Sequence, residues 1–234
     1  MHAVFLDYKT VDANDLDLGS IKELLPEIVV HAFSNEAEVL ERIEDAEVAI
    51  ANKVIFDAEV FARAKKLKLI CVTATGTNNI DLEAATRSGV VVCNIRDYCT
   101  DSVVQHVLLS ILTLMHSFKD YSDSIESGDW QDGKSFSLLQ HPIAELSGKS
   151  IGILGYGVLG QGVARAAAAL GLNVLVCESF AKDKKPDEDL KRISFETFLT
   201  ESDIISLHCP LTDNTEGLFD DNAFKKMKSS AILI

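Results

Sequence analysis

The sequence has no long apolar run, no excess of basic residues and no paired cysteine spacing. A membrane-spanning helix needs about 20 consecutive apolar residues, so the membrane-spanning class is excluded. Residues 1–7 lack a basic segment followed by a long apolar one, and they indicate no signal peptide. The cysteines form no CxxC pair, and a structural zinc site requires such spacing. We therefore expect no metal and no membrane partner.

Charge and cysteine content limit the class of protein further. The net charge is −14 and the isoelectric point is about 4.8, which argues against nucleic-acid binding through a basic face. The five cysteines are an odd number, and most lie in or beside apolar runs. We expect buried free thiols in a reducing cytoplasm. With 47% hydrophobic residues in 234, the chain can form one large or two modest domains.

One stretch carries a recognisable binding pattern. An apolar run, 150–154, leads into Gly155-Tyr156-Gly157-Val158-Leu159-Gly160, then an Ala-rich segment, a second apolar run and Glu178. This order of strand, glycine motif, helix, strand and acid is typical of a dinucleotide site. Its glycines allow a tight turn, an approach to the pyrophosphate and close helix packing, and Glu178 would bind the ribose hydroxyls of NAD. The alternative is an ordinary glycine-rich turn.

Residues 1–98 show a regular alternation of strands and helices. Such alternation favours parallel strands joined by right-handed crossovers. Ser34 is the expected N-cap of the helix that follows it. The expected strands are 3–7, 28–33, 48–51, 69–73 and 90–93, and the expected helices are 20–25, 36–43, 57–65 and 81–88.

Residues 99–234 open with a long helix and then return to the same alternation. Ser102 with Gln105 is a capping-box pattern, and apolar spacing extends the helix to about Ser127, before a loop to Ser150. The charged run 180–190 is expected to be a solvated loop. The further strands expected are 150–154, 173–177, a short one near 193, 203–207 and 231–234, with helices at 158–170, 195–201 and 220–226.

Four segments spread over nearly the whole chain resemble the D-isomer-specific 2-hydroxyacid dehydrogenase family. They are residues 75–81, 102–106, 155–160, and the run 208–212 with Thr215. The runs 50–53, 74–77 and 92–95 are most similar to the glycerate (hydroxypyruvate) dehydrogenase branch. The resemblance implies an NAD-dependent enzyme that interconverts a small 2-keto acid and its D-2-hydroxy acid. It also implies a homodimer formed through the cofactor domain.

The implied fold class is α/β with two Rossmann-like units. Residues 1–98 would be a flavodoxin-like substrate domain, and residues 99–234 an NAD-binding doubly wound parallel sheet, incomplete at its C-terminus. The substrate would lie in the cleft, near Lys53 and the backbone of Thr75, Gly76 and Thr77. Besides the glycine motif and Glu178, the cofactor would contact Val103, His208, Cys209, Pro210 and Thr215.

Each of these assignments has a plainer alternative. Lys53 can be a solvated surface residue, and residues 75–77 a simple turn before Asp81. Val103 fits the core face of an amphipathic helix, and the segment around Pro210 can be a packed loop. Cofactor choice is also contested, because Glu178 repels the 2′-phosphate of NADP while Lys182, Lys184 and Lys185 would attract it.

The family's catalytic Arg, Glu and His have no counterparts here. The resemblance places all three beyond Ile234, so no catalytic residue is assigned, and a polypeptide ending at Ile234 is expected to be inactive. The six histidines are expected to be structural or on the surface, and Gln105 stands where the family usually has Glu. The apolar run at the end indicates truncation. Two rival interpretations are a non-catalytic NAD-sensing protein and an inactive fragment of the same fold.

Overall fold

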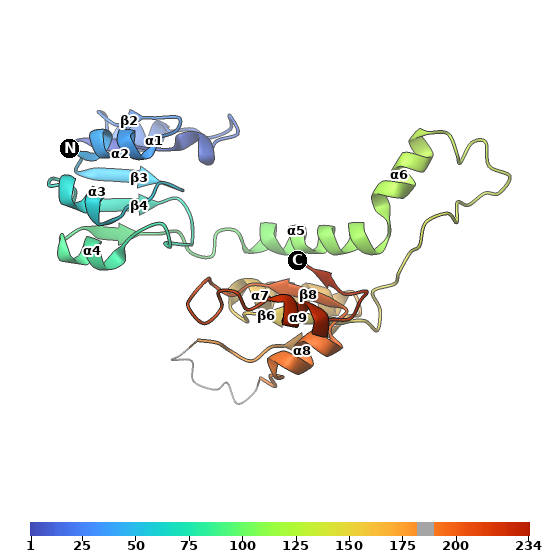
Figure 1. The fold of residues 1–234 in the computed structure, drawn as a ribbon. Coiled ribbons are helices and arrows are strands. Elements are labelled where there is room, and N and C mark those ends of the chain that lie inside the picture. Colours follow the sequence, from blue (N-terminus) through green and yellow to red (C-terminus); the bar gives the residue numbers. More distant parts are fainter. Residues whose placement is uncertain (182–189) are drawn as a thin grey trace. The chain divides into compact units, whose positions relative to one another are not determined.

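The chain forms two compact units, Met1–Tyr98 and Cys99–Ile234, in a computed structural model that describes residues 1–181 and 190–234 (Figure 1). We call them unit 1 and unit 2. Each is built on a parallel sheet with helices between the strands, which confirms the expected α/β class.

Unit 1 contains a parallel sheet in the order β2-β1-β3-β4-β5, the order typical of flavodoxin-like folds. Its core combines Val4, Ile70 and Val72 of the sheet with Ile43 and Val60 of the helices. The strands are β1 (Ala3–Phe5), β2 (Val29–Val30), β3 (Val48–Ala51), β4 (Leu69–Val72) and β5 (Val91–Cys93). The helices are η1 (Tyr8–Thr10), α1 (Gly19–Leu24), α2 (Glu36–Ile43), α3 (Ala58–Arg63) and α4 (Leu82–Arg87).

Side-chain caps start three of these helices. Asp57 caps α3, Asp81 caps α4, and Asn35 caps α2 in a capping box with Glu38. The prediction that Ser34 caps α2 is wrong by one residue. The Ser34 hydroxyl instead donates a hydrogen bond to the Leu6 carbonyl. The strand expected over 28–33 is also shorter, because beyond β2 the edge segment pairs with β1 only through isolated bonds such as His31 N–H to the Phe5 carbonyl, 2.8 Å.

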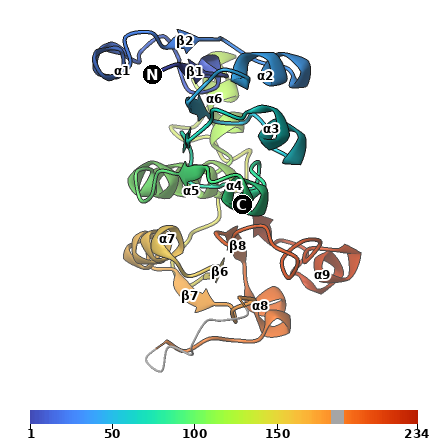
Figure 2. The same cartoon turned by 90° about the vertical axis from the view of Figure 1, so that its left-hand side faces the viewer.

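Unit 2 contains, among the described residues, a parallel sheet in the order β7-β6-β8-β9. Helix α7 covers one face, while α8 and α9 lie on the other (Figure 2). The strands are β6 (Ser150–Leu154), β7 (Asn173–Val176), β8 (Ile204–Leu207) and β9 (Ile232–Leu233). The helices are α5 (Thr100–Met115), α6 (Phe118–Glu126), α7 (Val158–Ala169), α8 (Phe195–Glu201) and α9 (Asp221–Lys226). The strand expected near Ile193 is a single bridge to Cys177.

The long helix departs from expectation at both ends. Helix α5 begins at Thr100, and its N-cap Cys99 makes no side-chain hydrogen bond, so Ser102 lies inside the helix and the expected capping box is wrong. The helix stops at Met115 because Ser117 adopts a left-handed conformation, φ 46°, and its hydroxyl donates to the Pro142 carbonyl. A second helix, α6, then runs from Phe118 to Glu126.

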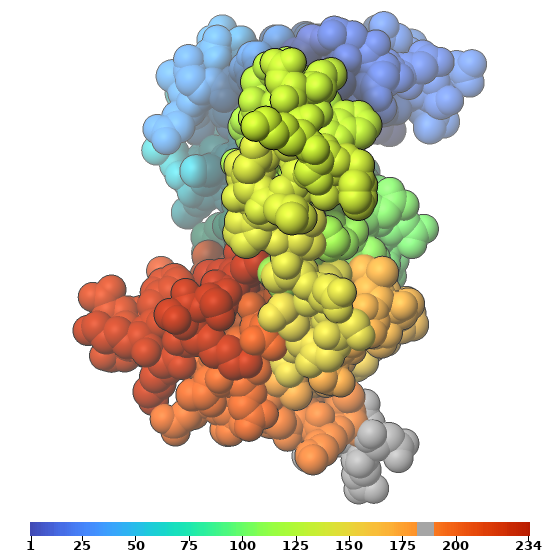
Figure 3. Space-filling view, turned by 90° about the vertical axis from the view of Figure 1, so that its right-hand side faces the viewer, coloured from blue at the N-terminus to red at the C-terminus, as the bar shows by residue number. Residues whose placement is uncertain are grey.

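Residues 117–145 form a projecting segment that we call the arm. Figure 1 shows α6 and the chain after it extending away from the sheet of unit 2, and the arm is yellow-green to yellow on the surface in Figure 3. The arm is held together locally. The Tyr121 hydroxyl donates to the carbonyls of His141, 2.8 Å, and Leu138, 3.3 Å, and the Ser124 hydroxyl lies 3.1 Å from His141 Nε2.

The structure also tests the expected burial of the cysteines. All five cysteines are free thiols, but only Cys177 is buried and Cys93 is exposed, so the expected burial is wrong for the others. Cys71 and Cys93 lie in β4 and β5, whereas Cys99 and Cys209 lie in the loops before α5 and after β8. Within residues 1–181 and 190–234 no helix has the length and apolarity to cross a membrane. The same residues contain no cluster of His, Cys, Asp and Glu suited to a metal ion.

Candidate functional site

The glycine motif connects β6 to the N-terminus of α7. Gly155 has φ +92°, and a Cβ there would lie 2.4 Å from the Cys209 nitrogen. A Cβ at Gly160 would lie 2.0 Å from the Gly155 carbonyl oxygen. Both positions therefore require glycine, the first for the turn and the second for close packing of α7 on the strand.

Gly157 differs from the other two glycines. In the described part of the chain, apart from the two neighbouring residues, no heavy atom lies within 4 Å of a Cβ built on it, and its backbone is extended, φ −87°. The space beside it opens toward the first N–H groups of α7, which begin at Val158. Free N–H groups at a helix start attract an anion, so the motif leaves room for a pyrophosphate where it would be bound best.

A pocket lies at the carboxyl ends of β6, β7 and β8. Open α/β sheets bind ligands at this edge, where adjacent connections diverge. The pocket is lined by Leu154, Gly155, Tyr156, Gly157, Glu178, Ser179, Phe180, Ala181, Arg192, His208, Cys209, Pro210, Thr212 and Thr215. It thus brings together most of the cofactor residues expected from the sequence.

Glu178 is exposed at the rim of the pocket, just past β7. Its Oε1 accepts a hydrogen bond from the Phe195 N–H at 2.6 Å, at the first residue of α8. The carboxylate therefore has one fixed oxygen and a defined direction, and Oε2 has no partner among the described residues. Nearby, Arg192 Nη1 donates to the Cys177 carbonyl at 2.8 Å. A carboxylate fixed in this way suits the vicinal hydroxyls of a ribose.

His208 lines the pocket, and its ring is held by a hydrogen bond with Ser206. Its Nε2 lies 2.8 Å from the hydroxyl of Ser206, a fully buried residue of β8. Burial lowers the pKa of His208 below its ordinary value, so the ring is neutral at pH 7. A neutral ring that accepts from Ser206 presents Nδ1–H as a donor. No pattern in the sequence indicates the Ser206 contact.

The loop after β8 is closed by Thr215 rather than by Pro210. Its hydroxyl donates to the Pro210 carbonyl at 2.7 Å and accepts from the Thr212 N–H at 2.8 Å. The thiolate forms of the two thiols nearby are disfavoured, because burial raises the pKa of Cys209, and it raises the pKa of Cys177 to about 12.

Some expected cofactor residues lie outside this pocket. Val103 is half-buried on α5 and packs against the core, which agrees with the alternative that it lies on the core face of an amphipathic helix. Val158 and Leu159 lie in the first turn of α7, and Gly160 is buried beneath it. None of these four residues lines the pocket. The expected counter-charges Lys182, Lys184 and Lys185 lie outside the described residues.

The expected substrate residues lie in unit 1, at the carboxyl ends of β3 and β4. Lys53 is exposed between the buried residues Asn52 and Val54. The Thr75 carbonyl accepts from Asn94 Nδ2 at 2.7 Å, and the Thr77 carbonyl accepts from the Ile80 N–H at 3.0 Å. The loop around exposed Gly76 is thus fixed by its carbonyl groups.

Sequence reasoning did not assign six pocket residues, which are Leu154, Ser179, Phe180, Ala181, Arg192 and Thr212. Three of them follow Glu178 directly, so their place after a strand end was a usable signal. Thr212 belongs to the motif already noted at 208–212. Arg192 is 14 positions from Glu178 in the sequence, and no local pattern places it in the pocket.

The chain matches known proteins over most or all of its length. The family described as D-isomer specific 2-hydroxyacid dehydrogenase, NAD binding domain, matches residues 108–234. A glycerate dehydrogenase of Methylorubrum extorquens is 38% identical, over 99% of this chain and 70% of its own length. A hydroxypyruvate reductase of Blautia hydrogenotrophica is 32% identical, over 100% of this chain and 73% of its own.

Solved structures give the same result. A Thermus thermophilus protein superimposes with a TM-score of 0.83 at 30% identity, over 100% of this chain and 72% of the other. The NAD complex of a formate dehydrogenase from Staphylococcus aureus has a TM-score of 0.80 at 27% identity, over 100% and 72% of the two chains.

The residues of the pocket fit the cofactor named by the family. The open side of Gly157 leaves room for phosphates, and the fixed carboxylate of Glu178 leaves an oxygen for the ribose. The chain belongs to the family of D-isomer specific 2-hydroxyacid dehydrogenases, which are NAD-dependent oxidoreductases, and its NAD-binding domain includes residues 108–234.

Proposed function

We propose that the protein interconverts a small 2-keto acid of the hydroxypyruvate or glyoxylate type and its D-2-hydroxy acid. The observation that carries this proposal is the pocket at the carboxyl ends of β6, β7 and β8, with a fixed Glu178 and an open Gly157. The relatives named glycerate dehydrogenase and hydroxypyruvate reductase support the substrate class. Bound NADH would supply the hydride.

We expect unit 2 to bind the cofactor and unit 1 to bind the substrate. Residues 99–234 would be the NAD-binding domain, where the N–H groups at 155–160 bind the pyrophosphate and Glu178 binds the ribose. His208, neutral and held by Ser206, would donate from Nδ1–H to the nicotinamide end, beside the loop closed by Thr215. Val103, Val158 and Leu159 would pack behind the NAD-binding pocket and would not contact the cofactor with their side chains.

Residues 1–98 would be the substrate domain. The keto acid carries a carboxylate, and unpaired N–H groups of a loop such as Thr75-Gly76-Thr77 can bind one. Exposed Lys53 would add a positive charge at the end of the neighbouring strand. Cytoplasmic location fits the five free thiols, which persist in a reducing compartment.

The arm supports a homodimer formed through unit 2. Its large apolar side chains are exposed, among them Phe118, Phe136 and Leu139, the last two at 93% and 86%. Apolar groups of this size on a projecting segment favour burial in an interface. A second copy of the chain is the partner we propose.

The test of the proposed function is keto-acid-dependent oxidation of NADH, followed by the loss of NADH absorbance. The full-length protein, to which the family resemblance assigns a catalytic Arg, Glu and His after residue 234, should turn over hydroxypyruvate or glyoxylate at ordinary enzyme rates, about 1–1000 per second. Pyruvate serves as the comparison substrate, because it lacks the hydroxyl of hydroxypyruvate. Tight NADH binding without turnover of any keto acid would contradict the proposal and favour an NAD-sensing protein.

A further inference from the structure

Asp7 is a buried carboxylate at the end of β1, with 3% of the residue exposed. None of the ion pairs in the described part of the chain includes it. A buried carboxylate without a cation must be compensated by hydrogen bonds, since desolvation otherwise costs several kcal/mol.

Three consecutive backbone N–H groups supply this compensation. The Asn52 N–H donates to Asp7 Oδ1 at 2.9 Å, and the N–H groups of Lys53 and Val54 donate to Oδ2 at 2.6 and 3.3 Å. Hydrogen bonds to an ionised acceptor are about twice as strong as neutral ones. One carboxylate therefore fixes the whole turn that follows β3.

The same turn is fixed from the opposite side by Asn79. Its Nδ2 donates to the Val54 carbonyl at 2.7 Å, and its own carbonyl accepts from the Phe56 N–H at 2.8 Å. Asn79 lies two residues after Thr77, the last residue of the other expected substrate segment. Asp7 and Asn79 thus connect the ends of β1, β3 and β4 into one hydrogen-bonded network.

Within this network only the side chain of Lys53 is directed outward. Asn52 and Val54 are buried, whereas Lys53 is exposed although its N–H is bound at 2.6 Å. A fixed backbone beneath a long, flexible cation restricts where the ammonium can reach, and such preorganisation lowers the cost of binding an anion.

We propose that Asp7 is the positioning residue of the Lys53 turn, which it holds in the conformation that binds the carboxylate of the keto acid. This inference rests on the proposed function. It differs from that proposal in assigning a role to a group that contacts neither substrate nor cofactor. A merely structural Asp7 would affect stability alone, whereas a positioning residue changes affinity for one ligand.

The experiment compares Asp7→Asn with unmodified full-length protein. The amide keeps the shape but removes the charge and one acceptor oxygen. The KM for hydroxypyruvate or glyoxylate should rise about tenfold, the effect of losing one charge-assisted hydrogen bond. The kcat should change less than threefold, because binding lost equally in the ground and transition states leaves kcat unaltered. The affinity for NADH, a ligand of unit 2, should stay within twofold.

Asp12→Asn is the matched control, because Asp12 is also a carboxylate of unit 1 that accepts backbone N–H groups, those of Asn14, Asp15 and Leu16. It does not contact residues 52–54, and it should leave the KM unchanged. An equal rise of KM in both variants, or no rise in Asp7→Asn, would overturn the inference.

Lys53→Met separates this inference from the function on which it rests. If Lys53→Met raises the KM and Asp7→Asn does not, the positioning role fails alone. If Lys53→Met leaves the KM unchanged, the substrate assignment of Lys53 fails and the inference fails with it. Should Asp7→Asn not fold, Asn79→Ala removes the opposite contact to the same turn, and an unchanged KM there would overturn the inference.

Discussion

At the scale of single residues, Gly157 is the clearest test of the dinucleotide loop. Its Cβ position is empty in the described structure and its backbone is open to any residue. Gly157→Val should therefore leave the melting temperature within a few degrees of the unmodified protein. It should lower the affinity for NADH at least about tenfold, or 1.4 kcal/mol, because the side chain fills the space of the pyrophosphate. Calorimetric titration and a thermal scan measure the two effects.

Gly160→Ala supplies the contrasting control. The added Cβ would lie 2.0 Å from the Gly155 carbonyl oxygen, so the strand and α7 must separate, and overpacking of this kind typically costs about 1–3 kcal/mol. It should lower the melting temperature before it affects binding. Full NADH affinity in Gly157→Val would show that the motif is only a turn.

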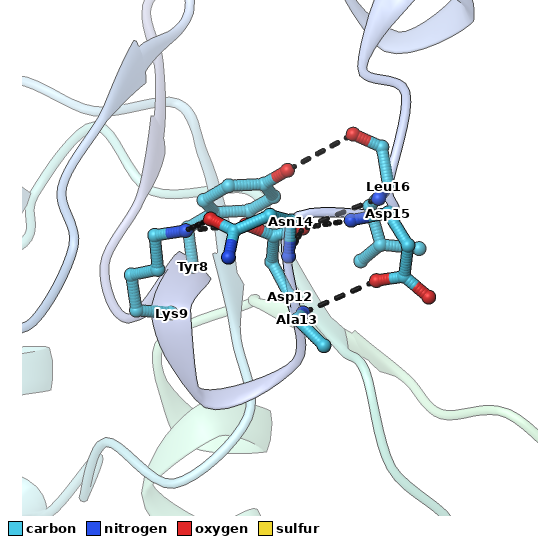
Figure 4. A network of polar contacts seen from close by, with 7 residues as sticks. All are labelled: Tyr8, Lys9, Asp12, Ala13, Asn14, Asp15 and Leu16. Atoms are coloured by element: carbon cyan, nitrogen blue, oxygen red, sulfur yellow. Dashed lines mark hydrogen bonds and ion pairs between the residues drawn. The ribbon is translucent and has the colours of Figure 1, made fainter.

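A second residue, Asp12, predicts a pH dependence of stability. It accepts hydrogen bonds from Lys9 and from three backbone N–H groups of its own loop (Figure 4). The hydrogen bond from Lys9 lowers the pKa of Asp12 from 3.8 to about 2. The ionised form is therefore favoured in the folded state, and its stabilising effect is complete above about pH 4 and lost as the pH falls toward 2.

Urea unfolding of the unmodified protein and of Asp12→Asn measures this effect. The difference in unfolding free energy should be constant from pH 7 to pH 5 and should shrink below pH 4. A difference that persists unchanged to pH 2.5 would contradict the role of the charge.

At the scale of elements, the arm depends on local hydrogen bonds for its order. The Tyr121 hydroxyl donates to two carbonyls at the far end of the arm. Tyr121→Phe removes both bonds and should weaken local closure by about 1 kcal/mol. Limited proteolysis should then cut between residues 127 and 140 about fivefold faster than in the unmodified protein, while cleavage in unit 1 is unchanged. Equal rates at both places would show that the arm is held by other contacts.

Elements with strong periodicity could be predicted from the sequence, and elements fixed by distant contacts could not. Helix α2, strand β3 and helix α8 begin and end where expected, because apolar spacing and flanking polar residues mark them. The break between α5 and α6 was missed, since no Gly or Pro marks Ser117, and its left-handed conformation depends on a bond to Pro142.

The candidate site likewise contains residues that could be predicted from the sequence and residues that could not. The glycine motif and Glu178 were accessible because their function needs fixed local spacing. Arg192 beside Cys177 and Asp7 beside Lys53 join segments that are adjacent only in the fold, and the contact of Ser206 with His208, two residues away, depends on how the strand end directs both side chains. Their side chains carry no local signal, so tertiary structure was needed to find them.

At the scale of the whole molecule, the exposed arm predicts self-association through unit 2. The protein should sediment as a dimer at micromolar concentration. Replacing Phe136 and Leu139 by Ser should shift it toward monomer, with a dissociation constant at least about 100-fold higher, since burying each side chain contributes about 1.5–3 kcal/mol. Exposed Leu24 and Phe33 of unit 1, changed to Ser, are the matched control. A dimer that survives the first pair and dissociates with the second would place the interface in unit 1.

We expect unit 2 to bind NAD through the pocket bordered by Gly157 and Glu178. The most direct test is calorimetric titration of the purified protein with NADH and, separately, with NADPH. We predict one NADH per chain and an affinity at least about tenfold higher than for NADPH, because the Glu178 carboxylate accepts the 2′-hydroxyl and repels a 2′-phosphate. Glu178→Gln should narrow that difference. No binding of either cofactor, or equal affinity for both in the unmodified protein, would contradict the claim.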